Sequence, residues 1–469
     1  MDRSVFAERR RRVAEALRAA GGGLALLPTA PERPRNRDTL YPFRADSYFW
    51  YLTGFGEPEA WLAIDDEGHS TLWCRPRDPE REIWDGVRLG PEAAPEALGV
   101  DRALPIETLD EQLPTLLSGR PAVWWPFGVH EGLEARIARW IEAVRAKERQ
   151  GAEPPRAQRD LTALLDEMRL VKDAAEQATM RRAAQISARA HARAMQRSAA
   201  WLREAPGQTW REYHLEAELL HEFRRQGAQA PAYPSIVAAG ANACILHYAA
   251  GDAPLAPGEL VLVDAGCELD GYASDITRTF PCDGRFTGPQ RELYELVRAA
   301  QEAAIAATHP GARQRDAHHA AVRVLAQGML ELGLLSRERH GSLDDVIEKA
   351  AYRQFYMHGT GHWLGLDVHD VGSYMQEDEP AVEQPDGLGG RVVKKPSRIL
   401  QPGMVVTIEP GLYVRPAEGV PEHYWHVGIR IEDDALVTPE GCELLTRGVP
   451  VHPDEIEALM RDASERPTA

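Results

Sequence analysis

The sequence lacks several features that would define an unusual class of protein. It has five cysteines in 469 residues, scattered and without a CxxC pair. This pattern argues against a disulfide framework and against a zinc finger, and it favours a reducing compartment, so we expect a cytoplasmic protein. No stretch approaches the roughly 18 uninterrupted apolar residues of a membrane span, and the N-terminus lacks the apolar core of a secretory signal. We therefore expect no membrane association.

Positive charge is also scarce. The chain has 54 Lys and Arg against 72 Asp and Glu, which gives a formal net charge of -18. Such an acidic chain is a poor electrostatic match for nucleic acid, so we expect no nucleic-acid partner. The one basic run, Arg9 to Arg12, is predicted to lie on the solvated face of an amphipathic helix. Two hydrolase motifs are absent as well: the HExxH of thermolysin-like zinc sites and the GxSxG nucleophile elbow.

The length suggests two or three domains, and the apolar content of 43% is enough for sizeable cores. The first part alternates short apolar runs, such as 23–27 and 60–64, with helical patterns, which indicates an α/β domain. A polar stretch at 147–159 predicts a linker or loop. We place the boundary between domains 1–170 and 171–469.

The second part mixes helices with antiparallel hairpins, which is typical of an α+β domain. Its predicted helices are 173–203, 210–227, 288–308 and 313–334. Its predicted strands are 233–240, 260–265, 272–280, 404–409 and 427–432. The segment 375–397 is acidic, then rich in glycine, then basic, and it is predicted to be a surface loop inserted between two elements.

Two aspartates lie on a predicted hairpin in the second part. The run Leu260 to Asp264 and the run Tyr272 to Phe280 flank an Asp-Gly turn signal. If Leu269 and Asp270 form the turn, Asp264 lies opposite Asp275, with Cβ atoms about 4.5–5.5 Å apart. Each aspartate alone could equally cap a loop or face solvent. Together they repel each other, and a cation would relieve that repulsion.

A second pair of apolar strands carries two glutamates. Strand 404–409 ends on Glu409, strand 427–432 ends on Glu432, and we expect the two strands to form a hairpin. Alternation puts Glu409 on the face of Thr407, and Glu432 on the face of Arg430, which could orient a carboxylate. Read alone, the glutamates could instead be surface residues in a salt bridge.

Histidines cluster between 358 and 370, where His358, His362 and His369 alternate with glycines that allow close backbone approach. Imidazole is a common metal ligand and moves protons near neutral pH. His247 follows an apolar run and, alone, would more often be a satisfied core residue. The remaining helical histidines are predicted to lie on helix surfaces, namely His214, His221, His318 and His319.

Two aspartates, two glutamates and one histidine form an oxygen-rich ligand set. Such a set suits hard or borderline divalent cations, manganese first, with cobalt, zinc or iron as alternatives. Four carboxylates balance two divalent ions, and a water held between the ions would become a ready nucleophile. The set therefore predicts a two-metal hydrolase.

These residues stand in the order and context of the ligands of the pita-bread metallopeptidases, and the chain most resembles aminopeptidase P. The resemblance is carried by CILHY at 244–248, LVDAGCELDGYASDITRTFP at 262–281, HWLGLDVHDVG at 362–372, EPGLY at 409–413 and GIRIEDD at 428–434. The N-terminal part resembles the same family through FRADSYFWYLTGF at 43–55 and EIWDGVRLG at 82–90. It implies a pita-bread catalytic domain behind a smaller creatinase-like α/β domain with a role in substrate access and oligomerisation.

The resemblance also implies an activity and a role for each residue. The enzyme would release the first residue of peptides with proline second, using a metal-bridged hydroxide and Glu409 as general base. Asp264 and His362 would each bind one ion, and Asp275 and Glu432 would bridge them. His247, His358 and His369 would contact the substrate, Arg430 would support the site, and Tyr413 would line the pocket. Trp84 would reach a neighbouring subunit in a tetramer, or the oligomer would be a dimer.

Two rival functions stay open at this point. Prolidase shares the site but cuts only dipeptides that end in proline, and it agrees less well with EIWDGVRLG. A metal-free binding protein on the same fold would normally have lost ligands, whereas all five are present. The interposed segment 375–397, with Pro396 where the family has an arginine, is the main departure from the family pattern.

Overall fold

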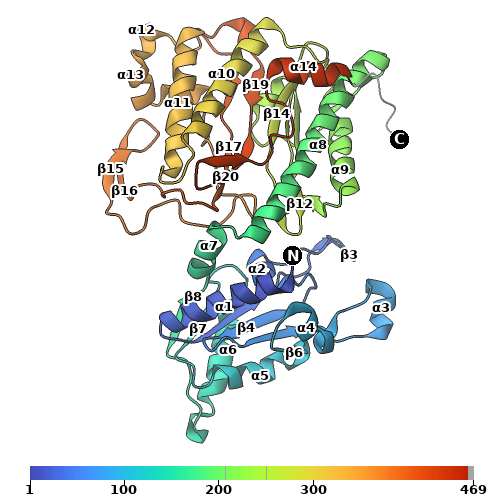
Figure 1. The fold of residues 1–469 in the computed structure, drawn as a ribbon, viewed down its shortest axis with the longest axis vertical. Coiled ribbons are helices and arrows are strands. Elements are labelled where there is room, and N and C mark those ends of the chain that lie inside the picture. The colour runs from blue at the N-terminus through green and yellow to red at the C-terminus, as the bar shows by residue number, and fades with distance from the viewer. Residues whose placement is uncertain (206, 250, 463–469) are drawn as a thin grey trace. The chain divides into compact units, whose positions relative to one another are not determined.

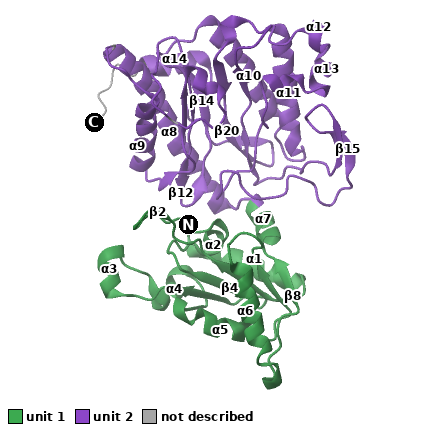
Figure 2. Ribbon diagram, turned by 180° about the vertical axis from the view of Figure 1, so that it is seen from behind, with its two compact units in different colours: residues 1–169 green, residues 170–469 purple. Residues whose placement is uncertain are grey.

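The computed structural model describes residues 1–205, 207–249 and 251–462, and it divides into two compact units. Unit 1 is Met1–Arg169 and unit 2 is Leu170–Ala469 (Figure 2). None of the helices in the described ranges combines the length and the apolar composition that a bilayer span needs.

Unit 1 is built on a six-stranded sheet in the order β6-β5-β4-β1-β7-β8 (Figure 1). β4 pairs antiparallel with β1 and β5, and the other pairs are parallel. The strands are β1 (Leu24–Pro28), β4 (Trp61–Asp65), β5 (Ser70–Cys74), β6 (Arg102–Pro105), β7 (Ala122–Trp125) and β8 (Ala157–Asp160), with a separate hairpin of β2 (Pro34–Asn36) and β3 (Thr39–Leu40). The helices are α1 (Arg3–Ala19), α2 (Ser47–Thr53), α3 (Pro79–Asp85), α4 (Gly90–Leu98), α5 (Leu109–Leu117), α6 (Leu133–Arg145) and α7 (Thr162–Leu170), which runs one residue into unit 2.

Local patterns located the central strands of unit 1 but misplaced two polar segments. Both apolar runs form strands, β1 and β4, and every residue of each is buried. The stretch 147–159 is not wholly a linker, because it contains the start of β8, a polar strand at the sheet edge. The basic run of α1 is not fully solvated either. Arg9 and Arg10 are 1% and 3% exposed, and their guanidinium groups donate to the carbonyls of Tyr51 and Leu52.

Unit 2 carries long helices on either side of small antiparallel sheets (Figure 1). α8 packs on α9, and α10 packs on α11. The helices are α8 (Ala174–Glu204), α9 (Glu212–Arg225), α10 (Gly288–Ala306), α11 (Gln314–Glu331), α12 (Arg337–His340), α13 (Leu343–Glu348) and α14 (Pro453–Asp462). The strands are β9 (Ala230–Pro231), β10 (Ile236–Ala239), β11 (Leu260–Asp264), β12 (Cys267–Leu269), β13 (Tyr272–Ala273), β14 (Thr277–Pro281), β15 (Val382–Pro385), β16 (Arg391–Lys394), β17 (Val405–Ile408), β18 (Gly411–Val414), β19 (Val427–Arg430), β20 (Asp433–Val437) and β21 (Cys442–Leu444).

The first hairpin exists, but its predicted register is wrong by two residues. Its turn is Asp270 and Gly271, both with positive φ of 50° and 83°, as a two-residue hairpin turn requires. Asp264 therefore pairs with Thr277 and not with Asp275. Asp275 lies in the break between β13 and β14, where strand alternation does not apply, but its Oδ1 and that of Asp264 both lie 2.6 Å from the hydroxyl of Tyr233.

The predicted hairpin between the two glutamate-bearing strands does not exist. β17 pairs with β20, and β19 pairs with β18, so the two strands belong to different sheets. The partner of β17 is β20, which follows β19 in the chain, and the partner of β19 is β18, which precedes it. The charge of Glu409 nevertheless acts on Glu432, so the two carboxylates lie near each other. Local alternation correctly put Thr407 beside Glu409, but it contains no information on strand partners.

The segment 375–397 is not a plain loop. It contains the antiparallel hairpin of β15 and β16, and its tip is held by Asp386, whose carboxylate accepts the backbone N–H groups of Leu388 and Gly390. An isolated bridge between Met375 and Ser397 closes the base of the segment. The insertion is thus an ordered arm of unit 2.

Candidate metal centre

Carboxylates from four strand ends and one histidine converge inside unit 2. Ligand atoms of Asp275, His362 and Glu432 all lie within 4.8 Å of one another. Glu409 joins this group because its Oε1 lies 3.7 Å from His362 Nε2. Asp264 joins it through a shared partner, described next. The five residues that the sequence singled out as ligands are therefore neighbours in space.

Two residues tie Asp264 into the cluster. The hydroxyl of Tyr233 lies 2.6 Å from Oδ1 of Asp264 and 2.6 Å from Oδ1 of Asp275. Arg430 Nη2 donates to the other carboxylate oxygen of Asp264 at 2.6 Å. Arg430 is thus placed to orient a carboxylate. Tyr233 was missed from the sequence, because a tyrosine in a loop before a strand gives no signal for such a role.

The tautomer of His362 follows from its neighbours. Nδ1 lies 2.9 Å from the carbonyl oxygen of Trp363, so this nitrogen carries the proton that it donates. Nε2 lies 3.5 Å from Asp275 Oδ2 and faces the carboxylates. A backbone carbonyl on one ring nitrogen, with the other aimed at acidic groups, is the usual arrangement of a metal-binding histidine.

The glycines around His362 allow the loop to lie directly on β17. Backbone hydrogen bonds join Thr407 N to His362 O, and Glu409 N to Thr360 O. A Cβ on Gly361 would lie 1.9 Å from the carbonyl oxygen of Thr407. Only glycine therefore allows this approach, which sets the distance between His362 and Glu409.

Burial strongly perturbs the carboxylates. Burial raises the pKa of Glu409 to about 7, and burial together with the charge of Asp275 raises the pKa of Glu432 well above its usual value. Burial also raises the pKa of Asp264, although the charge of Arg430 acts to lower it. Burial acts to raise the pKa of Asp275, but the hydrogen bond and charge of His362 outweigh it and the pKa is lowered. Closely packed, buried carboxylates of this kind fit divalent cations, which would replace the protons.

A short relay connects Arg430 to the histidine loop. Arg430 Nη1 donates to the Tyr413 hydroxyl at 3.0 Å, and that hydroxyl lies 2.8 Å from His358 Nε2. His358 Nδ1 lies 2.7 Å from the carbonyl of Gly359, so Nε2 is the acceptor for Tyr413. Burial, and then the charge of Arg430, lowers the pKa of His358 to about 3, and this ring is neutral at physiological pH.

The remaining predicted site residues differ in location and in exposure. The ring of His369 lies 4.3 Å from that of His362, edge to face. His247 is exposed, and its charge acts on both His358 and His369. Trp84 lies on α3 in unit 1 and is 84% exposed. Its place relative to the metal ligands of unit 2 stays a prediction.

His318 does not lie freely on a helix surface as predicted. Its Nδ1 lies 2.8 Å from Thr360 Oγ1, which also lies 2.6 Å from the hydroxyl of Tyr356. His214 also has a local role, since its Nδ1 accepts the N–H of Arg211 at the start of α9. Helical spacing alone could not show either contact.

Glu212 is a further residue that sequence reasoning missed. Its buried carboxylate accepts four hydrogen bonds, from Ala239 N (2.9 Å), Asn242 Nδ2 (3.0 Å), the Tyr248 hydroxyl (2.9 Å) and Gly251 N (3.1 Å). These donors bracket the segment that carries His247. A glutamate in the first turn of a predicted helix was the only available signal, and its burial is known only from the structure.

We expect Glu212→Gln to lower the free energy of unfolding by about 2–3 kcal/mol, because its amide nitrogen would face two donors that then have no acceptor. Loss of the loop geometry should also reduce kcat. Glu216→Gln, on the same helix and without a hydrogen bond to this loop among the described residues, is the matched control. Urea unfolding of both variants measures the difference. Equal stability of the two variants would contradict this account of Glu212.

Protons compete with cations in this centre. Burial opposes charge on His362, but its hydrogen bond to Asp275 and the charge of Glu409 raise its pKa to about 9. Because the pKa of Glu409 is about 7, both His362 and Glu409 hold protons in the metal-free protein at pH 6. Both folded pKa values exceed the ordinary values of 6.5 and 4.5, so their stabilising effect is complete at low pH and is lost as the pH rises through 7 and 9.

We therefore expect the affinity for a divalent cation to rise from pH 6 to pH 9, as the stability of the metal-free protein falls. Each displaced proton contributes up to about tenfold per pH unit. Titration calorimetry in buffers of different ionisation enthalpy counts the released protons. In His362→Gln the part of the dependence between pH 7 and 9 should vanish. Affinity that is independent of pH would contradict the prediction.

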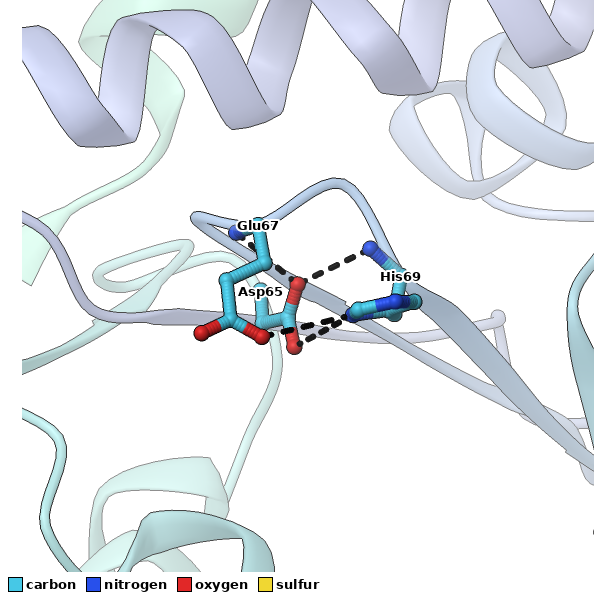
Figure 3. Close-up of side chains that lie close together, drawn as sticks. All are labelled: Asp65, Glu67 and His69. Atoms are coloured by element: carbon cyan, nitrogen blue, oxygen red, sulfur yellow. Dashed lines mark hydrogen bonds and ion pairs between the residues drawn. The ribbon is translucent and has the colours of Figure 1, made fainter.

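A second small cluster, in unit 1, has a structural explanation (Figure 3). Asp65, Glu67 and His69 offer ligand atoms within 4.8 Å of one another. Asp65 Oδ1 already accepts the backbone N–H groups of Glu67 and His69, at 3.0 and 2.8 Å. Its Oδ2 pairs with Arg120 at 2.9 Å. These contacts shape the turn between β4 and β5, so we assign no metal site here.

Buried, clustered carboxylates and one oriented imidazole define a metal-dependent hydrolase centre on an α+β fold. Comparison with known proteins agrees with that class. Residues 178–439 match the model of metallopeptidase family M24, and residues 6–124 match the aminopeptidase P N-terminal domain. The chain belongs to metallopeptidase family M24 and, within it, to the Xaa-Pro aminopeptidases.

Individual relatives cover nearly the whole chain. The Xaa-Pro aminopeptidase of Escherichia coli is 44% identical over 98% of both chains, and human Xaa-Pro aminopeptidase 3 is 34% identical over 92% of this chain and 79% of its own. The structure of Pseudomonas aeruginosa aminopeptidase PepP is 47% identical and has a TM-score of 0.90 over 99% of both chains. A variant of E. coli aminopeptidase P in complex with substrate has a TM-score of 0.89 at 44% identity over 99% of this chain and 100% of its own. The predicted family and pita-bread fold are confirmed.

Proposed function

We propose that this enzyme releases the first residue of peptides that have proline in the second position. Its membership of the Xaa-Pro aminopeptidases supports this substrate class. The single observation that carries the chemistry is the clustering of five candidate ligands: Asp275, His362 and Glu432 lie together, Glu409 lies beside His362, and Asp264 shares the hydroxyl of Tyr233 with Asp275. Asp264, Asp275, His362, Glu409 and Glu432 would hold two divalent cations. Four of the five ligands are carboxylates, which favours manganese over softer ions, with cobalt, zinc and iron as alternatives.

Bound divalent ions would polarise the scissile carbonyl and lower the pKa of a water molecule. Glu409 is suited to take up a proton, because its pKa is raised to about 7 and Thr407 Oγ1 donates to its Oε1 at 3.3 Å. The neutral ring of His358 lies 3.7 Å from Glu409 Oε2, and His247 and His369 lie around the same space. These three histidines would contact the substrate and stabilise developing charge, with Arg430 and Tyr413 fixing their arrangement.

Unit 1 would serve substrate access and assembly. Trp84, Ile83 and Val87 are 84%, 81% and 78% exposed, and large apolar side chains gathered in this way favour a contact with another subunit. We propose a homotetramer, or a dimer, in which Trp84 contributes to a neighbouring site. The five free cysteines support a reducing compartment, the cytoplasm, and the net charge of -18 supports the absence of a nucleic-acid partner.

The substrate class is tested with matched peptides. We expect the manganese-loaded enzyme to cleave the first bond of Ala-Pro-Ala and to leave Ala-Ala-Ala intact. Ala-Pro is the control that distinguishes prolidase, since exclusive cleavage of this dipeptide would overturn the proposal in favour of that rival. Chelated enzyme restored separately with manganese, cobalt or zinc ranks the metals.

A further inference from the structure

A cavity of about 760 Å³ lies in unit 2 behind the loop that carries His358 and Gly361. Its walls come from α11, from the 3₁₀ turn Ala351–Gln354 and from the inserted arm of β15 and β16. The metal ligands do not line it. The role proposed above for the metal centre therefore leaves the cavity unexplained.

Two arginines of this cavity have no carboxylate partner among the described residues. Arg315 and Arg353 line it, both are half-buried, and among the described residues neither lies within 4.0 Å of a carboxylate. His318 and His319 line it as well. Burial, together with the charges of His319, Arg315 and Arg353, lowers the pKa of His318 to about 4, so these groups act on one another.

Most other charged residues of the same cavity do have partners. Arg323 pairs with Asp344 at 3.4 Å, and Arg391 pairs with Glu383 at 3.3 Å. Asp386 is engaged by the backbone of its own turn. Glu348 is exposed at the rim. In a chain of net charge -18, two half-buried arginines without carboxylate partners are unusual, because a neighbouring acidic residue would normally stabilise them.

The cavity also touches the catalytic residues. His358, Thr360 and Thr407 line it, and His318 hydrogen-bonds to Thr360. The carbonyl of Thr360 accepts the backbone N–H of Glu409 at 2.8 Å. His318, on which the charges of Arg315 and Arg353 act, is therefore linked through Thr360 to the backbone of Glu409.

We propose that this cavity binds an anionic group, a carboxylate or a phosphate, between Arg315 and Arg353. Guanidinium groups recognise either oxyanion through paired hydrogen bonds. The anion is either an acidic group in the distal part of the peptide substrate or a free small ion. The first source rests on the proposed function, and the second does not.

The double variant Arg315→Gln/Arg353→Gln tests the site, and Arg323→Gln, which removes a paired arginine of the same cavity, is its matched control. Binding of inorganic phosphate is measured by calorimetry at constant ionic strength. We expect wild type and the control to bind and the double variant to lose at least about tenfold in affinity, since both guanidinium groups that would bind the anion are removed. Thermal unfolding confirms that each variant is folded.

Peptide kinetics identify the source of the anion. The two peptides Ala-Pro-Ala-Glu and Ala-Pro-Ala-Gln differ only in whether the last side chain is a carboxylate or an amide. If the substrate supplies the anion, the ratio of their kcat/KM values should fall toward one in the double variant. An unchanged ratio, with phosphate binding lost, supports a free ion instead. Identical behaviour of the double variant and Arg323→Gln in both assays overturns the proposal. An enzyme that cleaves no Xaa-Pro peptide would refute the proposed function, and phosphate binding would still decide the cavity.

Discussion

Asp264→Ala is expected to reduce kcat/KM for an Xaa-Pro tripeptide by at least about 10³-fold, on the order of 4 kcal/mol in transition-state free energy. The substitution removes a carboxylate from a cluster in which Tyr233 and Arg430 hold it at 2.6 Å. It also leaves the buried charge of Arg430 without its carboxylate partner. A cation held by the remaining ligands would be bound more weakly and in a different position, so both affinity and reactivity should suffer.

The measurement is kcat/KM together with metal content after dialysis, because loss of the ion and loss of its correct placement are then separated. Glu440→Ala, an exposed carboxylate of the same unit, is the control and should behave as wild type. Exhaustive chelation of wild type should give the same loss, reversed by added manganese. Full activity of chelated Asp264→Ala would refute the metal-dependent scheme.

Arg278→Met is expected to have the largest effect on stability, a loss of about 3–5 kcal/mol in the free energy of unfolding. Arg278 and Asp433 are both 0% exposed and pair at 2.7 Å, and Arg278 Nη1 also donates to the carbonyl of Glu432. Removing the guanidinium leaves Asp433, among the described residues, with Arg447, Gln301 and Thr446 as partners. The penalty arises because the charge of Asp433 is then only partly compensated by the more exposed Arg447, and because the carbonyl oxygens of Thr277 and Glu432 lose this donor.

Chemical denaturation of the metal-free protein measures the effect without a contribution from bound cations. Arg323→Met is the control, since its pair with Asp344 is 63% and 81% exposed and should be worth less than about 1 kcal/mol. Arg278→Met/Asp433→Leu should recover part of the lost stability, because it removes both charges. Equal losses in Arg278→Met and Arg323→Met would show that burial does not govern this pair.

The sequence predicted the helices of unit 2 closely. The predicted helix 173–203 is α8 (Ala174–Glu204), and 288–308 is α10 (Gly288–Ala306). Both predictions used periodicity and end signals, which are properties of a few adjacent residues. Strand faces were predicted equally well, since Thr407 does lie beside Glu409.

Strand partners were not predictable in the same way. Glu409 and Glu432 were assigned to one hairpin, but β17 and β19 pair with other strands. A partner is selected by burial summed over the whole domain, and any apolar strand satisfies local alternation. The shifted register of Asp264 has a related cause, since the turn that sets it depends on which two residues adopt positive φ.

The sequence by itself predicted the chemistry of this protein: the five candidate ligands, the strand ends that carry them and the family pattern that contains them. Only the tertiary structure decided which groups surround those ligands. Tyr233 between two aspartates, Glu212 behind the His247 loop and the arginine-lined cavity are all products of contacts between distant segments. Ligand identity follows from local pattern, whereas desolvation, hydrogen-bond partners and cavities depend on how the whole chain packs.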